Sequence, residues 1–318
     1  GHTLEHFEDI LAVDTTIIRL NDMLSDSFTG CSDGVASAKL DIVMNVAEAT
    51  PRRSKIAEVK QSVQGFWTEL GGWVSGKLMV FDLGYYDFNF FHRIDAKGGY
   101  FISRLKDGAN PLIVDNHLTC RGNSIDLEGK NLQDVLDRLK RQTLDLTVEI
   151  EVQMQKYRGT RSTRRKQMRL VGRRNDETGE YHLYLTNIDP ETLSVADIAE
   201  TYRLRWQIEI LMKQLRSHNR LDEVPSSKEH VAQILLYASI IALLVSRALL
   251  RELRSKDRGE FYPAQRFQAV FEAYAQPALR AVTEPRRRTS LSVFECIARE
   301  ANDPNLIRDR GMDVMYRL

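Results

Sequence analysis

The order of the apolar segments in the first hundred residues constrains the fold of this chain more than any other feature. Segments rich in β-branched or alternating apolar residues predict three consecutive strands, and then a strand, a short helix and a strand. This order predicts a mixed α/β sheet with helices on its faces. The predicted strands cover residues 10–20, 38–48, 54–61, 77–84 and 100–106, with helices over 66–73 and 88–96 and a turn at Thr50-Pro51.

The rest of the chain divides into further segments. We expect residues 1–106 to form the first part of the sheet core and residues 107–186 to form a β-rich insertion. Residues 187–255 are expected to complete the core with two helices, one of them apolar and buried, and residues 256–318 to form a C-terminal helical region. Helices are predicted over 131–142, 194–217, 227–254, 264–282 and 291–301, and insertion strands over 144–153, 167–173 and 181–187.

The charge and cysteine content exclude some classes of protein. The 318 residues include 45 Lys and Arg and 44 Asp and Glu, so the chain is not basic throughout, although a local basic patch remains open. The three cysteines, Cys31, Cys120 and Cys296, lie far apart without a Cys-x-x-Cys pair. This argues against a zinc ribbon and favours a reducing compartment, which we expect to be the cytoplasm.

One apolar run requires a membrane check. Residues 234–245 read ILLYASIIALLV, which is shorter than the roughly 20 residues that a transmembrane helix needs. We therefore predict a buried core helix and no membrane partner. The chain opens with Gly-His and not Met, which is typical of a processed or cloned fragment and leaves open whether an N-terminal domain is missing.

Two acidic residues interrupt apolar strands. Asp14 lies inside the first predicted strand and Asp82 lies near the end of the fourth. Asp is disfavoured within strands, and a buried carboxylate is costly unless it is paired or bound to a metal ion. On neighbouring strands the two acids would lie side by side, and a divalent cation would relieve their repulsion. The alternative is a pair of strand-end acids that reach solvent.

A third acid lies on the polar face of the predicted helix over 194–217. The opposite face is an apolar stripe of Leu204, Ile208, Leu211 and Leu215. The polar face consists, in chain order, of Tyr202, Arg205, Glu209, Lys213 and Arg216, which fall within an arc of roughly 80°. Taken alone, this pattern favours a solvated face with ordinary ion pairs.

Together the three acids resemble the signature of bacterial insertion-sequence DDE transposases. Asp14 lies within AVDTTIIRL and Asp82 within VFDLGYYDFNFF. Residues 202–216 have the spacing Tyr-x2-Arg-x3-Glu-x6-Arg, which is similar to the group with a Tyr-Arg-Glu-Lys motif and a β-rich insertion before the Glu. Arg216 replaces the Lys of that motif, which keeps the charge but alters the geometry. Residues 100–106 (YFISRLK) and 183–187 (LYLTN) also match.

The resemblance implies a ribonuclease H-like mixed sheet and a metal-dependent reaction on DNA. Asp14, Asp82 and Glu209 would be the catalytic residues and would hold two Mg²⁺ ions, for which Mn²⁺ could substitute. The reaction would cut DNA at transposon ends and join them to target DNA, by a cut-and-paste route through a hairpin. The partners would be double-stranded DNA and a second copy of the chain, and the enzyme would act at the bacterial nucleoid.

Several basic residues are candidate DNA contacts. Tyr202, Arg205, Lys213 and Arg216 would grip phosphates near the cut end. The insertion adds a basic segment between residues 156 and 174, which has no Asp or Glu and in which Arg164, Arg165 and Lys166 are consecutive. The alternative for this segment is a solvated loop. Tyr181 and His182 are the nearest positions to an aromatic residue that stacks on a flipped base in related enzymes, although a strand Tyr usually serves packing.

Two other functions remain open. The first is a catalytically inactive, element-derived DNA-binding protein, against which the three acids argue. The second is a ribonuclease H-like nuclease that cuts DNA without joining it. The sequence does not separate this nuclease from a transposase, whereas a strand-transfer assay does.

Overall fold

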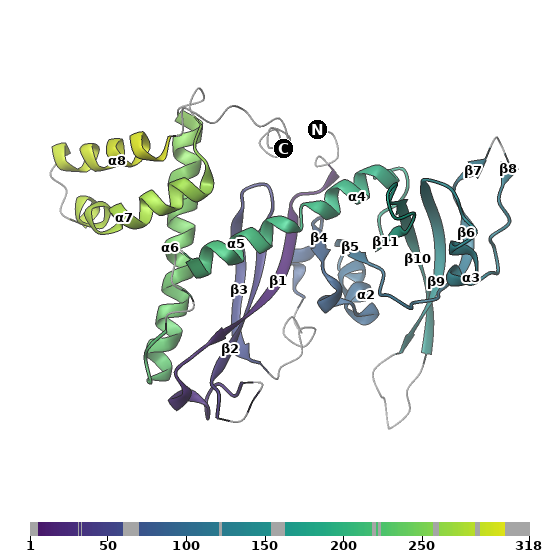
Figure 1. Ribbon diagram of the computed structural model, residues 1–318, viewed down its shortest axis with the longest axis horizontal. Coiled ribbons are helices and arrows are strands. Elements are labelled where there is room, and N and C mark those ends of the chain that lie inside the picture. Colours follow the sequence, from purple (N-terminus) through teal and green to yellow (C-terminus); the bar gives the residue numbers. More distant parts are fainter. Residues whose placement is uncertain are drawn as a thin grey trace. The chain divides into compact units, whose positions relative to one another are not determined.

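The computed structural model describes residues 6–30, 32, 34–59, 70–120, 123–153, 163–217, 221, 224–256, 261–283 and 287–302 (Figure 1). The chain forms two compact units. The first unit contains residues 1–14, 43–46 and 61–208, and the second contains residues 15–42, 47–60 and 209–318. Each unit is described by itself below. The four segments predicted from the sequence stay a prediction.

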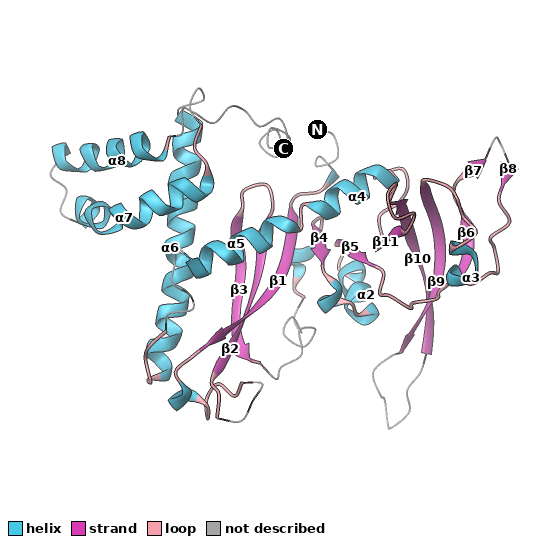
Figure 2. Ribbon diagram, in the orientation of Figure 1, coloured by secondary structure: helices cyan, strands magenta, loops and turns pink. Residues whose placement is uncertain are grey.

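Within the described residues, nine strands form one mixed sheet in the order β3-β2-β1-β4-β5-β11-β10-β9-β6 (Figure 2). The predicted mixed α/β architecture is therefore confirmed. The strands are β1 (Ile10–Arg19), β2 (Ser37–Asn45), β3 (Thr50–Glu58), β4 (Leu78–Phe81), β5 (Tyr100–Arg104), β6 (Leu112–Asn116), β9 (Thr143–Gln153), β10 (Thr163–Arg174) and β11 (Tyr181–Thr186). A separate short pair consists of β7 (Thr119–Cys120) and β8 (Asn123–Ser124).

The helices of the described residues precede or follow these strands. They are α2 (Phe88–Ala96), α3 (Leu132–Leu136), α4 (Val195–Arg203), α5 (Trp206–Ser217), α6 (Glu229–Lys256), α7 (Ala264–Thr283) and α8 (Arg287–Ala301). Three short 3₁₀ helices, η2 (Asp22–Leu24), η3 (Gly72–Val74) and η4 (Leu83–Tyr85), cover single turns.

The predicted strand-helix-strand unit is present as β4, α2 and β5. Asp87 begins α2, because its side chain accepts a hydrogen bond from the Phe90 backbone N–H at 3.0 Å. Gly99 permits the sharp turn into β5, since a Cβ atom there would lie only 2.8 Å from the Val74 carbonyl oxygen. Beneath α2, the stacked rings of Phe91 and Phe101 are 4.5 Å apart and bury this part of the sheet.

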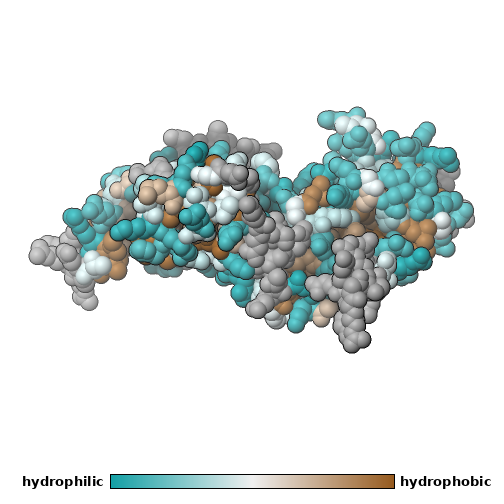
Figure 3. Space-filling view, turned by 90° about the horizontal axis from the view of Figure 1, so that it is seen from below, coloured by the Kyte–Doolittle hydropathy of each residue, from teal (hydrophilic) through white to brown (hydrophobic). Residues whose placement is uncertain are grey.

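The insertion strands continue the core sheet. β11 pairs antiparallel with β5, β10 pairs with β11, and β9 pairs with β10. The segment predicted as a β-rich insertion therefore contributes its strands to the sheet that carries the two aspartates. On the face drawn in Figure 3, small groups of apolar residues reach the surface between hydrophilic ones.

Several element boundaries differ from the prediction. The turn between β2 and β3 lies at residues 46–49, where Ala49 has a φ of 50°, and not at Thr50-Pro51. Pro51 is tolerated inside β3 because this strand is at the edge of the sheet. The helix predicted over 131–142 ends at Leu136. Of the helix predicted over 66–73, residues 66–69 lie outside the described part of the chain, and η3 covers the end.

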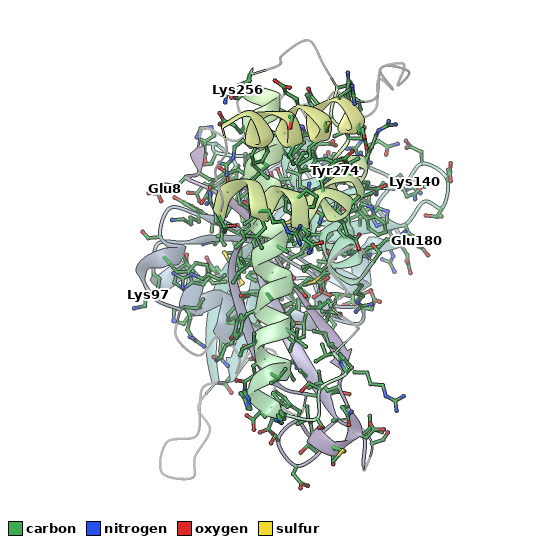
Figure 4. All side chains as sticks on the ribbon, turned by 90° about the vertical axis from the view of Figure 1, so that its left-hand side faces the viewer. Glu8, Lys97, Lys140, Glu180, Lys256 and Tyr274 are labelled. Carbon is green, nitrogen blue, oxygen red and sulfur yellow. The ribbon has the colours of Figure 1, made fainter. Side chains whose placement is uncertain are left out.

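Helix α6 is buried on one face only. It packs against β3 and α7 within the second unit, and Lys256 at its C-terminal end is labelled in Figure 4 together with Tyr274 on α7. The exposed apolar side chains are Ile234, Leu235, Tyr237, Ile241, Leu244 and Val245. The prediction of a buried helix therefore holds for the face that contains Leu236, Ile240 and Leu243, and is wrong for the other face. By length and composition alone α6 is long enough to cross a membrane, and 33% of its most apolar stretch is buried.

Two neighbouring isoleucines test this asymmetry of α6. Ile240 is 4% exposed and Ile241 is 58% exposed. We expect Ile240→Ala to lower the free energy of unfolding by about 2–5 kcal/mol, because it removes buried methyl groups and leaves a cavity. The matched variant Ile241→Ala should change it by less than about 0.5 kcal/mol. Urea denaturation of both variants checks this, and equal losses would contradict the one-sided packing of α6.

Candidate active site on three parallel strands

Three adjacent strands run parallel and in register in the first unit. β1 pairs with β4 through Ala12 and Val80, and β4 pairs with β5 through Val80 and Ile102. The residues two positions further along are Asp14 after Ala12, Asp82 after Val80 and Arg104 after Ile102. Because both pairs of strands are parallel, these three residues lie at the same level of the sheet, with Asp14 inside β1, Asp82 directly after β4 and Arg104 at the end of β5. The prediction that the two aspartates belong to neighbouring strands is confirmed.

The turn after β4 fixes the Asp82 carboxylate. Asp82 caps η4, and its Oδ1 atom accepts a hydrogen bond from the Gly84 backbone N–H at 2.9 Å. The preceding Phe81 is fully buried and packs on Phe90 with ring centroids 5.2 Å apart. Asp82 and Asp14 are both half-buried, so each reaches solvent while following buried residues. These side chains suit a divalent cation, since carboxylate oxygens and water are the ligands that Mg²⁺ prefers.

Tyr202 and Arg205 lie at the end of α4 and belong to the same part of the first unit. The Tyr202 ring packs on the Tyr184 ring of β11 at 5.0 Å, and the Arg205 guanidinium carbon lies 5.9 Å from the centre of the Tyr202 ring. Burial raises the pKa of Tyr202. The positive charges of Arg205 and Arg104 lower this pKa, and the negative charge of Asp82 raises it. The Tyr202 hydroxyl is therefore within electrostatic reach of both Asp82 and Arg104.

Arg104 is a site residue that sequence reasoning missed. It is exposed at the end of β5, and its backbone partner in β11 is Tyr184, on which Tyr202 packs. The segment YFISRLK was recognised as a strand, but nothing within it distinguishes Arg104 from the other basic residues. The available signal was positional, because Arg104 ends the strand next to the one that ends at Asp82.

The expected long helix is divided into α4 and α5. α4 ends at Arg203, α5 begins at Trp206, and a turn at residues 204–205 separates them. The apolar stripe is buried as predicted at Ile208, Leu211 and Leu215. On the polar face, Glu209 is half-buried, whereas Lys213 and Arg216 are exposed.

Arg216 connects the Glu209 face of α5 to strand β1 within the second unit. The Arg216 Nη2 atom donates a hydrogen bond to the Thr16 hydroxyl, which lies in β1 two residues beyond Asp14. Seven residues make almost two helical turns, so Glu209 and Arg216 lie on the same face of α5. The face that carries Glu209 is therefore the one in contact with β1.

The three predicted acidic ligands come from both units of the chain. Asp14 and Asp82 belong to the first unit and Glu209 to the second. Across the part of the chain that the structure describes, no three His, Cys, Asp or Glu side chains form a group that could hold a metal ion. The described geometry thus brings together the aspartate pair, and the role of Glu209 stays a prediction.

Two neighbouring cations of the basic segment, Arg165 and Lys166, contact acidic side chains. Lys156, Arg158 and Arg161 lie outside the described residues, as does the side chain of Arg164, whose backbone pairs with Val152. Arg165 is exposed and lies 3.4 Å from both Glu149 and Glu151 of β9. The Lys166 Nζ atom donates to Asp95 Oδ2 at 2.6 Å and contacts His92 Nδ1 at 2.8 Å.

These contacts give Lys166 a role within the fold. Burial alone raises the pKa of Asp95, but hydrogen bonds from Lys166 and Asn187 outweigh it and hold that pKa below its usual value. Tyr181 also has a contact within the protein, because its hydroxyl donates a hydrogen bond to the Arg141 carbonyl oxygen at 2.5 Å. The neighbouring His182 is exposed on β11.

The family of the chain follows from comparison with known proteins. Residues 5–245 match the family described as the transposase DDE domain, and the chain belongs to this family. The transposase of insertion sequence element IS231F from Bacillus thuringiensis subsp. israelensis is 23% identical over 293 residues, which are 81% of this chain and 61% of that protein. The transposase of IS1151 from Clostridium perfringens is 24% identical over 198 residues, covering 54% of this chain and 42% of that protein.

The matched region is a part of these relatives. The chain spans about 60% of the length of the IS231F and IS231E transposases. Among solved structures, the piggyBac transposase in a synaptic complex with hairpin DNA has a TM-score of 0.47 and 8% identity, covering 98% of this chain and 57% of that one.

The contact between Lys166 and Asp95 predicts that the pKa of Asp95 changes when Lys166 is replaced. We expect Lys166→Gln to raise the pKa of Asp95 towards or above its ordinary value of 3.8, because burial then acts without the opposing ammonium group. A depressed carboxyl pKa stabilises the fold above the unfolded pKa, and this contribution is lost as the pH falls through the folded pKa. The stabilities of wild type and variant should therefore converge at low pH. Carboxyl carbon NMR titration measures the shift, and Arg165→Gln should leave it unchanged.

Proposed function

We propose that this chain is the catalytic part of a DDE transposase with a ribonuclease H-like core, of the group with the Tyr-Arg-Glu-Lys motif. The observation that carries this proposal is the alignment of Asp14 and Asp82 at the same level of adjacent parallel strands, Asp14 inside β1 and Asp82 directly after β4. Family membership supports it, as does the end of α4, where Tyr202 is within electrostatic reach of Asp82. The substrate is double-stranded DNA at the transposon ends, and the product is an end joined to target DNA.

In this proposal Asp14, Asp82 and Glu209 hold two Mg²⁺ ions, and Mn²⁺ can replace them. When bound, such ions activate a water molecule or a DNA 3′-OH group and stabilise the leaving oxygen. The hydrogen bond from Gly84 to Asp82 Oδ1 orients one carboxylate before DNA arrives. The contact between Arg216 and Thr16 supports a Glu209 side chain on the side of α5 that is next to β1.

The cations of the site would hold the phosphates. Arg104, Arg205 and Arg216 can each bind a phosphate through two N–H groups, and Lys213 adds a point charge. Tyr202 would bind the end of the cut strand through its hydroxyl. These contacts fix the DNA backbone without reading its sequence. Of the insertion residues, Arg164 and Arg165 remain candidates, while Lys166 is already bound to Asp95.

The remaining steps follow the family group and belong to the same proposal. The enzyme would cut and paste its element through a DNA hairpin, would act as a homodimer on two ends, and would work in the bacterial cytoplasm at the nucleoid. Two alternatives make different predictions. A nuclease of this fold cuts without joining, and an inactive DNA-binding remnant binds without cutting.

A matched pair of Asp variants tests the catalytic pair. We expect Asp82→Asn to lower metal-dependent cleavage at the ends by about a thousandfold or more, because it removes a charged metal ligand. Asp87→Asn is the control, since Asn caps α2 as well as Asp does and cleavage should persist. The assay uses supercoiled DNA that carries the inverted repeats flanking the gene, with Mg²⁺, Mn²⁺ or EDTA.

The outcomes of this assay separate the alternatives. Cleavage followed by joining of a 3′-OH end to target DNA supports the transposase. Cleavage without joining favours the nuclease. Binding without cleavage by the wild type favours the inactive DNA-binding protein, and equal cleavage by Asp82→Asn and wild type would overturn the role of the aspartate pair.

The salt dependence of DNA binding tests whether Arg104 contacts a phosphate. We expect Arg104→Ala to weaken DNA binding and to reduce the slope of log K against log salt concentration by about 1, because one phosphate contact is lost. Arg280→Ala, on the exposed side of α7, should leave both quantities unchanged. Fluorescence anisotropy at several salt concentrations measures them. An unchanged slope for Arg104→Ala would remove this residue from the DNA contact.

A further inference from the structure

A buried ion pair joins two insertion strands. Arg169 of β10 and Asp145 of β9 are each only 6% exposed at the side chain. The Arg169 Nε atom donates to Asp145 Oδ1 and Nη2 donates to Oδ2, both at 2.7 Å. Residue 169 pairs with residue 147 and residue 171 with residue 145, so the two side chains are diagonal neighbours on one face of the sheet. This bidentate geometry satisfies the carboxylate and leaves one guanidinium nitrogen for other acceptors.

That nitrogen holds both ends of the connection between β11 and α4. The Arg169 Nη1 atom donates to the carbonyl oxygen of Ile188 at 3.1 Å and to that of Leu193 at 2.8 Å. Both residues are buried, and the Thr192 and Leu193 backbone N–H groups bond to the Asp189 carbonyl oxygen between them. The Arg169 guanidinium group therefore hydrogen-bonds to both ends of the connection and also to Asp145 of the insertion strand β9.

The connection leads directly into α4. Leu193 precedes Ser194, which caps α4 in a reciprocal capping box with Asp197. α4 packs against β10, in which Arg169 lies, and against β5 and β9. At the far end of the helix, Tyr202 packs on Tyr184. Figure 1 shows α4 beside the ends of β10 and β11. The start of α4 is thus fixed by Arg169 and its end by an aromatic contact.

We propose that Arg169 is a positioning residue for the reaction: it fixes the start of α4 on the insertion strands and thereby holds Tyr202, with Arg205 near its ring, on Tyr184, the register partner of Arg104. The inference rests on the proposed function. Stability alone does not explain the pair, because well-packed apolar residues often replace a buried ion pair without loss. Apolar side chains, however, cannot donate to the Ile188 and Leu193 carbonyl oxygens. The insertion therefore supports the site from within the protein, apart from any contact that it makes with DNA.

Two variants of the chain test this role. Arg169→Lys keeps the charge but loses the fork that binds Asp145 and both carbonyl oxygens. The double variant Arg169→Met with Asp145→Leu removes the ion pair without leaving an unpaired buried charge, so it remains informative if Arg169→Lys folds poorly. Arg173→Lys, an exposed residue of the same strand, is the matched control. Melting temperature and circular dichroism establish that each variant is folded.

Three quantities are measured on the folded variants: amide hydrogen exchange in α4, the DNA dissociation constant and the single-turnover cleavage rate at saturating DNA. For Arg169→Lys and the double variant we expect α4 amides to exchange at least tenfold faster while α2 amides are unchanged. Cleavage should fall at least tenfold, and the dissociation constant should rise by a clearly smaller factor, because Tyr202 and Arg205 are only two of the proposed phosphate contacts. A merely structural pair would not give this separation of rate from affinity. Arg173→Lys should match the wild type in all three.

Unchanged α4 exchange, or unchanged cleavage by the folded double variant, would overturn the proposal. Loss of affinity in parallel with rate would also overturn it, because Arg169 would then act on DNA binding. If the wild type itself does not cut, the proposed function fails, and hydrogen exchange still decides separately whether Arg169 anchors α4.

Discussion

The parallel pairing of β1 with β4 and of β4 with β5 is the constraint on which the rest of the site depends. Parallel pairing in a fixed register brings residues that are distant in sequence to the same level of the sheet. Asp14, Asp82 and Arg104 acquire their relationship from this pairing and not from any local motif. The aromatic packing of Phe81 and Phe91 beneath α2 fixes the middle strand, and the cap at Asp82 sets the direction of its carboxylate.

The insertion strands extend the same sheet, and this changes what the insertion does. β11 connects the insertion to β5 and supplies Tyr184, on which Tyr202 packs. Three cations of β10 contact acids: Arg165 contacts Glu149 of β9, Lys166 binds Asp95, and Arg169 binds Asp145. Buried cations need such partners, because leaving one unpaired in the interior costs several kcal/mol. Lys166 and Arg169, which belong to the segment predicted to contact DNA, thus serve the internal structure.

In the second unit, α6 shows how an apolar sequence can be divided between core and surface. Its inner face packs on β3 and α7, and Ser246 and Arg247 bind Gln268 and Gln214 there. Its outer face keeps large apolar side chains exposed. The helix is apolar all round, so periodicity could not distinguish these faces. Which face is buried depends on where β3 and α7 pack.

The sequence by itself determined the mixed α/β class, the strand-helix-strand unit next to Asp82 and the apolar stripe of α5. These features are local, since apolar periodicity and capping residues act over a few positions. The tertiary structure alone decided that Arg104 joins the aspartates, that the insertion continues the core sheet, and that Lys166 and Arg169 are bound internally. Each of these depends on strand register or on burial, which bring together residues 20 or more positions apart. The sequence shows that residue 169 is a cation but does not show which acid it binds, because the pairing of β9 with β10 places Asp145 beside it.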